Sequence, residues 1–207
     1  MINRCIQQIL LLALAVFISF ASDQVQAQAN KATESGGAKP VKVFILAGQS
    51  NMEGKATVAL LKYQMMQPET KDLFAHLHRN GELIERDDVH IKFLDRFGKL
   101  TAGFGSPNRI GPELQFGFSM GDRFEEPILL IKTAWGGKSL FRDFRPPSAG
   151  LPDAEVLNSQ LVKERKRQPE KTLNEVKDSY GFYYREMINE VEETLANIGD
   201  FVPSYNA

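Results

Sequence analysis

The chain has 207 residues, and its 25 Lys and Arg nearly balance its 26 Asp and Glu, so its formal net charge at pH 7 is −1. This balance provides no basic surface for nucleic acid, which we exclude as a partner. Hydrophobic residues make up 43% of the chain, and the length is sufficient for one domain with a substantial core. The only cysteine is at position 5.

The first 27 residues have the pattern of a secretory signal peptide. Arg4 supplies a positive charge, residues 6–20 are mostly apolar, and small residues up to Ala27 offer a cleavage site. An uncleaved membrane anchor is the alternative, but the uninterrupted apolar part, residues 9–21, is shorter than the roughly 20 residues of a spanning helix. We therefore expect a secreted or periplasmic protein with no stable membrane anchor after cleavage, and this cleavage removes the cysteine.

The mature chain is expected to begin with a flexible polar leader over residues 28–40 and to continue as one domain over residues 41–207. The domain opens with a continuous apolar run rich in β-branched residues, Val41 to Ala47, which predicts a buried strand of an α/β sheet. The polar turn Gly48-Gln49-Ser50-Asn51 follows. It places a serine just past the carboxyl end of the strand, where open α/β sheets bind ligands. The alternative is an ordinary loop with a Ser-Asn turn.

The region between residues 55 and 109 is predicted to contain two short helices, one alternating strand and a loop. The helices are expected within residues 55–67 and 69–79. An alternating pattern in residues 83–94 puts Val89, Ile91 and Phe93 on one face and His90 on the other, so we expect His90 to face solvent. The glycine-rich residues 97–109 predict an irregular loop.

His76 and His78 are separated by one residue in the second of these helices. Residues two apart do not share a helix face, and no acidic or histidine partner lies nearby in the sequence. We therefore expect packing or surface histidines and no metal site.

A second strand and a helix precede the last third of the chain. Pro112 suits the first position of a helix, and Gly111 precedes it, where free N–H groups can hold an oxyanion. Residues 127–134 form a second buried strand that leads into the turn Trp135-Gly136-Gly137. Two buried parallel strands with helices between them predict a doubly wound sheet, with this turn on the same edge as Ser50.

The last third is expected to contain an exposed, proline-rich and highly charged excursion over residues 141–171. One long helix is then predicted over residues 173–197, because apolar residues recur there at helical spacing. Gly181 lies inside this predicted helix.

The motif Gly48-Gln49-Ser50-Asn51-Met52 with Gly54 resembles the first block of the SGNH (GDSL-like) hydrolases, in particular the branch of sialate O-acetylesterases and acetylxylan esterases. The resemblance implies that Ser50 is the nucleophile and that its own N–H helps bind the oxyanion. Gly111-Pro112-Glu113 resembles the second block, which implies that the Gly111 N–H is the second oxyanion donor. Met52 breaks the G-x-S-x-G elbow of the α/β-hydrolases.

The resemblance implies a three-layer, doubly wound, mainly parallel sheet of the SGNH/flavodoxin-like type, with the C-terminal portion missing. It implies a secreted carbohydrate O-acetyl esterase acting on an acetylated sugar or polysaccharide, with no cofactor and no metal. Trp135 is interpreted either as a surface that stacks on a sugar or as a residue at the edge of the core. The residues expected to contact substrate are Gln49, Asn51, Glu113, Trp135, Gly136 and Gly137.

The chain lacks the D-x-x-H block that supplies the histidine base and its carboxylate in this family, since no histidine follows His90. We therefore predict a truncated form that is inactive alone. Two alternatives remain open. One is a secreted carbohydrate-binding module without catalysis, and the other is a rearranged site in which His76 or His90 is the base.

Overall fold

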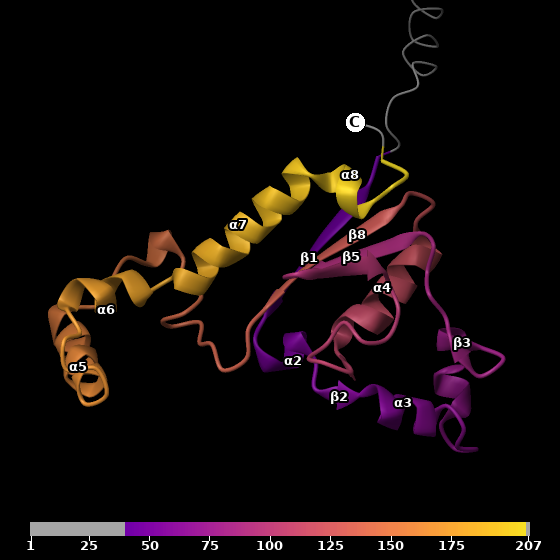
Figure 1. The fold of residues 1–207 in the computed structure, drawn as a ribbon, viewed down its shortest axis with the longest axis horizontal. Coiled ribbons are helices and arrows are strands. Elements are labelled where there is room, and N and C mark those ends of the chain that lie inside the picture. The colour runs from indigo at the N-terminus through magenta and orange to yellow at the C-terminus, as the bar shows by residue number, and fades with distance from the viewer. Residues whose placement is uncertain (1–39, 206–207) are drawn as a thin grey trace, which may run out of the picture. The chain divides into compact units, whose positions relative to one another are not determined.

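The computed structural model describes residues 40–205 (Figure 1). The predicted signal peptide and all of the predicted leader except Pro40 lie outside these residues. Within them, no helix is both long enough and apolar enough to cross a membrane.

The centre of the domain is a four-stranded sheet with the strand order β1-β8-β5-β6. Strands β1 (Lys42–Gly48), β8 (Ile128–Ala134) and β5 (Val89–Phe93) are parallel, whereas β6 (Arg96–Lys99) pairs antiparallel with β5. Every residue of β8 is buried, as its continuous apolar sequence predicts for a central strand. The predicted α/β fold with a mainly parallel sheet is confirmed.

Helices cover both faces of the sheet and make it the middle of three layers (Figure 1). Helix α4 (Pro112–Arg123) packs on one face, where Leu114 and Phe118 join the core with Leu130 of β8. Helices α7 (Phe182–Ala196) and α8 (Ile198–Phe201) cover the other face. There Val191 and Val202 pack against Leu129 and Ile131. Successive residues of β8 therefore serve opposite layers.

Shorter elements complete the domain. Helix α2 (Ser50–Glu53) follows β1 directly. The remaining elements are β2 (Ala56–Thr57), α3 (Val58–Gln64), η1 (Lys71–Leu73), η2 (Ala75–Leu77), β3 (His78–Arg79), β4 (Glu82–Leu83), β7 (Arg109–Ile110), η3 (Pro147–Ala149), α5 (Ala154–Arg165) and α6 (Leu173–Ser179).

Two local predictions were wrong, and a third was incomplete. The segment 69–79 forms two 3₁₀ turns and a short strand in place of a helix. Residues 97–99 belong to strand β6, because they pair with the edge of β5 that is not paired with β8. The excursion over residues 141–171 is mostly exposed, as predicted. It also contains helix α5, whose Leu157 packs with Val176 and Tyr180 of the following segment in a small separate core.

The single helix predicted over residues 173–197 is two helices, α6 and α7, which are divided at Tyr180 and Gly181. Gly181 has φ +70°, a left-handed conformation that glycine adopts without steric penalty. The carbonyl oxygen of Arg145 lies against its Cα, so a side chain there would collide with it. Apolar periodicity continues across the break, which is why the sequence pattern did not reveal it.

The prediction that His90 faces solvent was also wrong. Val89, Ile91 and Phe93 share one buried face as predicted, but His90 is only 6% exposed, because helix α8 packs over the opposite face of β5. Its burial is the main cause that lowers the pKa of His90, and Lys99 adds to this, while Asp88 and Asp87 oppose it.

Candidate active site

The Ser50 turn and the Trp135 turn lie side by side at one edge of the sheet, as predicted. Gly48 at the end of β1 is in register with Ala134 at the end of β8. The Trp135 N–H donates to the Gly48 carbonyl at 3.2 Å. Both turns therefore begin at the carboxyl ends of parallel strands, where this class of sheet binds ligands.

Ser50 is half-buried and is the first residue of helix α2. Among residues 40–205, its hydroxyl makes one side-chain hydrogen bond, which it donates to Gln49 Oε1 at 3.3 Å. An amide oxygen accepts a hydrogen bond but is not a base, so this contact orients the hydroxyl without activating it. Asn51 is exposed beside it.

Gly111 lies against the end of the Ser50 helix. A Cβ added to Gly54, which has φ +90°, would lie 2.5 Å from the Gly111 nitrogen, so only glycine permits this approach. Antiparallel pairing of β2 with β7, with Ala56 opposite Ile110, fastens the two segments just beyond the contact. The structure thus brings together the two segments that the family resemblance singled out.

A buried ion pair lies beneath this contact. Lys132 of β8 and Glu113 of α4 are both 0% exposed, and Lys132 Nζ donates to Glu113 Oε2 at 2.6 Å. Nζ also donates to the carbonyls of Glu53 at 3.0 Å and Phe104 at 2.7 Å, so all three of its protons are used. Burial is the main cause that lowers the pKa of Lys132, and Glu113 opposes it.

The second oxygen of Glu113 reaches the predicted oxyanion donor. The Gly111 N–H donates to Glu113 Oε1 at 2.8 Å. Glu113 was predicted to contact substrate, but its side chain is fully buried and both of its oxygens bind groups of the protein. In this structure its contacts are structural, and the Gly111 N–H is already engaged.

Glu53, the last residue of α2, joins three segments at the mouth of the site. Its Oε1 accepts from Ser106 Oγ at 2.6 Å and pairs with Lys55 Nζ at 2.8 Å. Its carboxylate also accepts a hydrogen bond from the backbone of Gly136. Burial alone would raise the pKa of Glu53, but these hydrogen bonds outweigh it and hold the pKa below its usual value.

A hollow of about 520 Å³ opens beside this carboxylate. It lies at the ends of β8 and β5, and its walls include Trp135, Gly136 and Tyr183. The ring centroids of Trp135 and Tyr183 are 5.1 Å apart, and Lys138 Nζ lies 4.3 Å from the centroid of the Tyr183 ring. The volume falls in the range of small-molecule sites. Gly137 lies in the same turn and is exposed.

None of the described histidines hydrogen-bonds to Ser50. His90 is in register with Leu129 at the start of β8, whereas Ser50 lies beyond Ala134 at the other end, about 16 Å along the strand direction. His76 Nε2 bonds to Gln115 Oε1 at 2.7 Å. Within residues 40–205, no group of three or more His, Cys, Asp or Glu side chains is placed to hold a metal ion.

Sequence reasoning missed Lys132, Glu53 and Ser106 as residues of the site. Lys132 could have been found from the sequence, because a lysine within an otherwise apolar strand requires a buried acid or carbonyl partner. Glu53 and Ser106 are 53 positions apart and carry no such signal.

A comparison with protein families agrees with this geometry. The family described as carbohydrate esterase, sialic acid-specific acetylesterase matches residues 40–198. None of the curated proteins compared with the chain matches it. Among solved structures, a protein from Arabidopsis thaliana resolved at 1.6 Å is similar over 79% of this chain and 71% of its own, with 16% identity and a TM-score of 0.31. Since the family match covers most of the domain, the chain belongs to the sialic acid-specific acetylesterase family of carbohydrate esterases.

Proposed function

We propose that this chain is the Ser50-bearing part of a secreted esterase that removes O-acetyl groups from sugars. The observation that carries the proposal is the position of Ser50 at the carboxyl end of β1, next to the contact between Gly54 and Gly111. The family match supports the reaction class. The signal-like sequence of the first 27 residues supports secretion.

In the proposed reaction, Ser50 Oγ attacks the acetyl carbonyl while a histidine accepts the hydroxyl proton. The developing oxyanion is stabilised by the N–H groups of Ser50 and Gly111, and each such donor contributes about 10²–10³ in rate. The sugar alcohol leaves with the proton of the histidine, and water then releases acetate from the acyl-serine. For Gly111 to take part, its N–H must share its bond to Glu113 with the oxyanion.

We propose that the histidine is supplied by polypeptide that this chain does not contain. No histidine follows His90 in the sequence. Two features of the described residues support a missing element next to β1. Strand β1 has a paired neighbour on one side only, and Ile45 in its middle is 52% exposed.

The proposed substrate is an acetylated sugar residue whose ring lies in the hollow beside Trp135. Gln49 and Asn51 are exposed at the Ser50 turn, and Gly136 and Gly137 are exposed at the neighbouring turn. This exposure supports their proposed role in substrate contact. The family description favours an acetylated sialic acid, and an acetylated polysaccharide is the second class.

Chemical rescue tests the role of Ser50 in the chain as it exists. Imidazole is added as an external base, and release of acetate from an aryl acetate and from an acetylated sugar is followed in the parent and in Ser50→Ala. We expect imidazole-dependent hydrolysis above that of Ser50→Ala, because the variant retains every other residue of the site. Equal rates in the two proteins at every imidazole concentration would remove Ser50 as the nucleophile.

A carbohydrate-binding module without catalysis is the second candidate. It is favoured because no base among residues 40–205 is bonded to Ser50, and because the first hollow has an aromatic wall. Trp135 is the only tryptophan of the chain, so its fluorescence reports sugar binding there. Saturable quenching by an acetylated sugar, without imidazole-dependent hydrolysis, would support the module over the esterase.

A further inference from the structure

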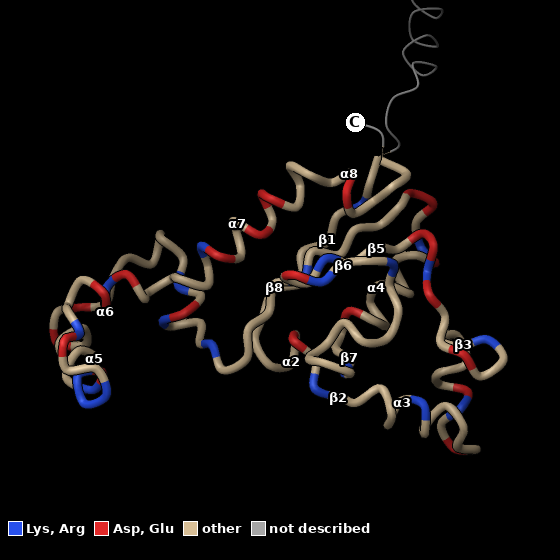
Figure 2. The backbone as a smooth tube through the Cα atoms, in the orientation of Figure 1, with Lys and Arg blue, Asp and Glu red and all other residues tan. Residues whose placement is uncertain are grey.

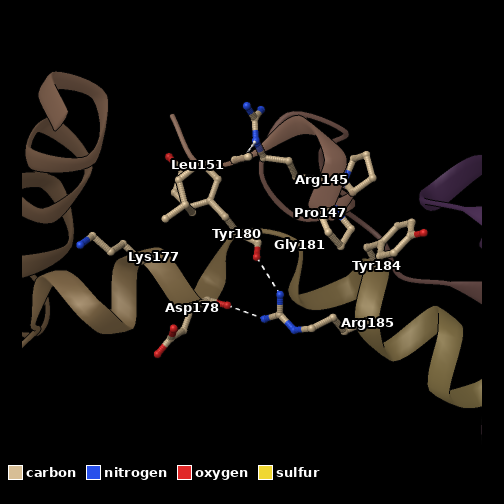
Figure 3. Close-up of a pocket in the computed structure, with 11 residues that line it drawn as sticks. Arg145, Pro147, Leu151, Lys177, Asp178, Tyr180, Gly181, Tyr184 and Arg185 are labelled. Carbon is tan, nitrogen blue, oxygen red and sulfur yellow. Dashed lines mark hydrogen bonds between the residues drawn. The ribbon is translucent and has the colours of Figure 1, made fainter. Parts of the chain in front are cut away.

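A second hollow, of about 490 Å³, lies between residues 145–151 and the junction of α6 with α7 (Figure 3). Neither Ser50 nor Trp135 lines it. Its volume also falls within the range of small-molecule sites. The function proposed above makes no use of it.

The walls of this second hollow carry an excess of positive charge. Three cationic side chains, Arg145, Lys177 and Arg185, line it together with one acid, Asp178. In Figure 3 the Asp178 carboxylate points away from Arg145.

The two arginines are held in place without being neutralised. Arg145 donates to the carbonyls of Phe141, Ala149 and Gly150, and Arg185 donates to those of Asp178 and Tyr180. Carbonyls fix a guanidinium but carry no net charge, and neither arginine forms an ion pair with an acid of the described chain. The result is a preorganised positive field, which favours a carboxylate.

The same walls present flat, rigid surfaces. Tyr180 and Tyr184 line the hollow from α6–α7, and Pro146, Pro147 and Leu151 line it from the facing loop (Figure 3). Aromatic side chains offer a large apolar face with a polar hydroxyl at the edge, at low entropic cost. A sugar ring has apolar C–H faces and polar edges, so it matches this wall better than an extended peptide does.

The two hollows adjoin the same turn of helix α7. Tyr183 lines the first hollow, beside Glu53 and Trp135, and the next residue, Tyr184, lines the second one. A helix with its side chains is about 10–12 Å across, which a short oligosaccharide can span. The first hollow is balanced in charge, since Glu53 and Asp95 line it with Arg96 and Lys138.

We propose that the second hollow is a glycan subsite for a sugar residue that bears a carboxylate. It follows that the ligand of this protein is an oligosaccharide or polysaccharide with an acidic residue in the second hollow, in contrast to a single acetylated sugar residue. The link to acetyl removal rests on the proposed function, whereas the binding does not depend on it.

The test measures binding by isothermal titration in a Ser50→Ala background, so that ester chemistry plays no part. The probes are an oligogalacturonate, its fully methyl-esterified form and a hexaglutamate peptide. The pocket variants are Lys177→Glu and Tyr184→Ala, which leave the two arginine clamps intact. The matched control is Lys163→Glu on α5, an exposed lysine of a separate basic cluster at the end of that helix (Figure 2). Circular dichroism verifies the fold of each variant.

We expect the oligogalacturonate to bind more tightly than its methyl ester and to lose affinity as salt rises. Lys177→Glu should weaken it about three- to fivefold, and Tyr184→Ala should weaken it as well, while Lys163→Glu leaves it unchanged. The proposal is overturned if the methyl ester binds as tightly as the acid, if hexaglutamate binds equally well, or if Lys163→Glu has the same effect as Lys177→Glu. Failure of the rescue experiment would leave this result unaffected.

Discussion

The buried pair of Lys132 and Glu113 allows a quantitative prediction. In Lys132→Met, the new side chain fills the space of the lysine stem, so the change mainly removes charge and hydrogen bonds. It leaves the Glu113 carboxylate in a site with 0% exposure and removes the donor to the Glu53 and Phe104 carbonyls. Removing one partner of a buried pair typically costs about 3–5 kcal/mol.

For a domain of this size, each kcal/mol lowers the melting temperature by about 2–4 °C, so a fall of roughly 10–15 °C is expected. Such a loss is a large fraction of the stability of an ordinary domain. Urea denaturation followed by circular dichroism measures the free energy of unfolding. Hydrogen exchange should accelerate at α2 and around Phe104, because Lys132 joins these two segments.

The double variant Lys132→Met with Glu113→Gln distinguishes a charge effect from a packing effect. Glu113→Gln removes the stranded carboxylate, so the double variant should be more stable than the sum of the two single losses predicts, by about 2 kcal/mol. Two results would refute this reasoning. One is a free energy of unfolding of Lys132→Met within about 1 kcal/mol of the parent's, and the other is a double variant whose loss of stability equals the sum of the two single losses.

Three further predictions concern other elements. The pKa of the buried His90 lies below its ordinary value of 6.5, so the unfolded chain gains a proton first as pH falls below that value. Stability should then decline as pH falls through about 6.5, and His90→Gln should flatten this slope in urea midpoints. Gly181→Ala should lower the melting temperature more than Gly137→Ala, because both glycines have positive φ but only Gly181 faces a backbone oxygen; equal losses would contradict the collision. Ile45→Lys should reduce aggregation, measured by light scattering, relative to Ile45→Val, because charge protects an unpaired strand edge.

The parts of the fold that the sequence predicted are those specified by local pattern. The two mainly apolar runs at residues 41–48 and 128–134 each predict a buried strand from their own residues alone. The structure has strands β1 and β8 there. Pro112 marks the start of a helix by its own backbone chemistry. The shared edge of the Ser50 and Trp135 turns then follows from parallel pairing alone.

The parts that the sequence did not predict depend on neighbours far along the chain. The alternation in β5 predicted one solvent-exposed face, but helix α8, more than 100 residues further along the chain, covers that face and buries His90. Glu113 was predicted to contact substrate because it adjoins Gly111 in a recognisable block. Its actual partner, Lys132, is 19 positions away on a strand whose pairing no local pattern specifies.

The same buried pair limits how the oxyanion site can operate. Lys132 holds Glu113 Oε2 at 2.6 Å, so Oε1 cannot rotate away from the Gly111 N–H unless the ion pair breaks. Breaking that pair costs about 3–5 kcal/mol, which is comparable with the roughly 2.7–4 kcal/mol that one oxyanion hydrogen bond contributes to catalysis, so breaking it brings no net gain. In the proposed mechanism, the Gly111 N–H therefore binds the oxyanion as a shared donor while Glu113 stays in place. A carboxylate next to an oxyanion is repulsive, and the Lys132 charge offsets that repulsion from the buried side.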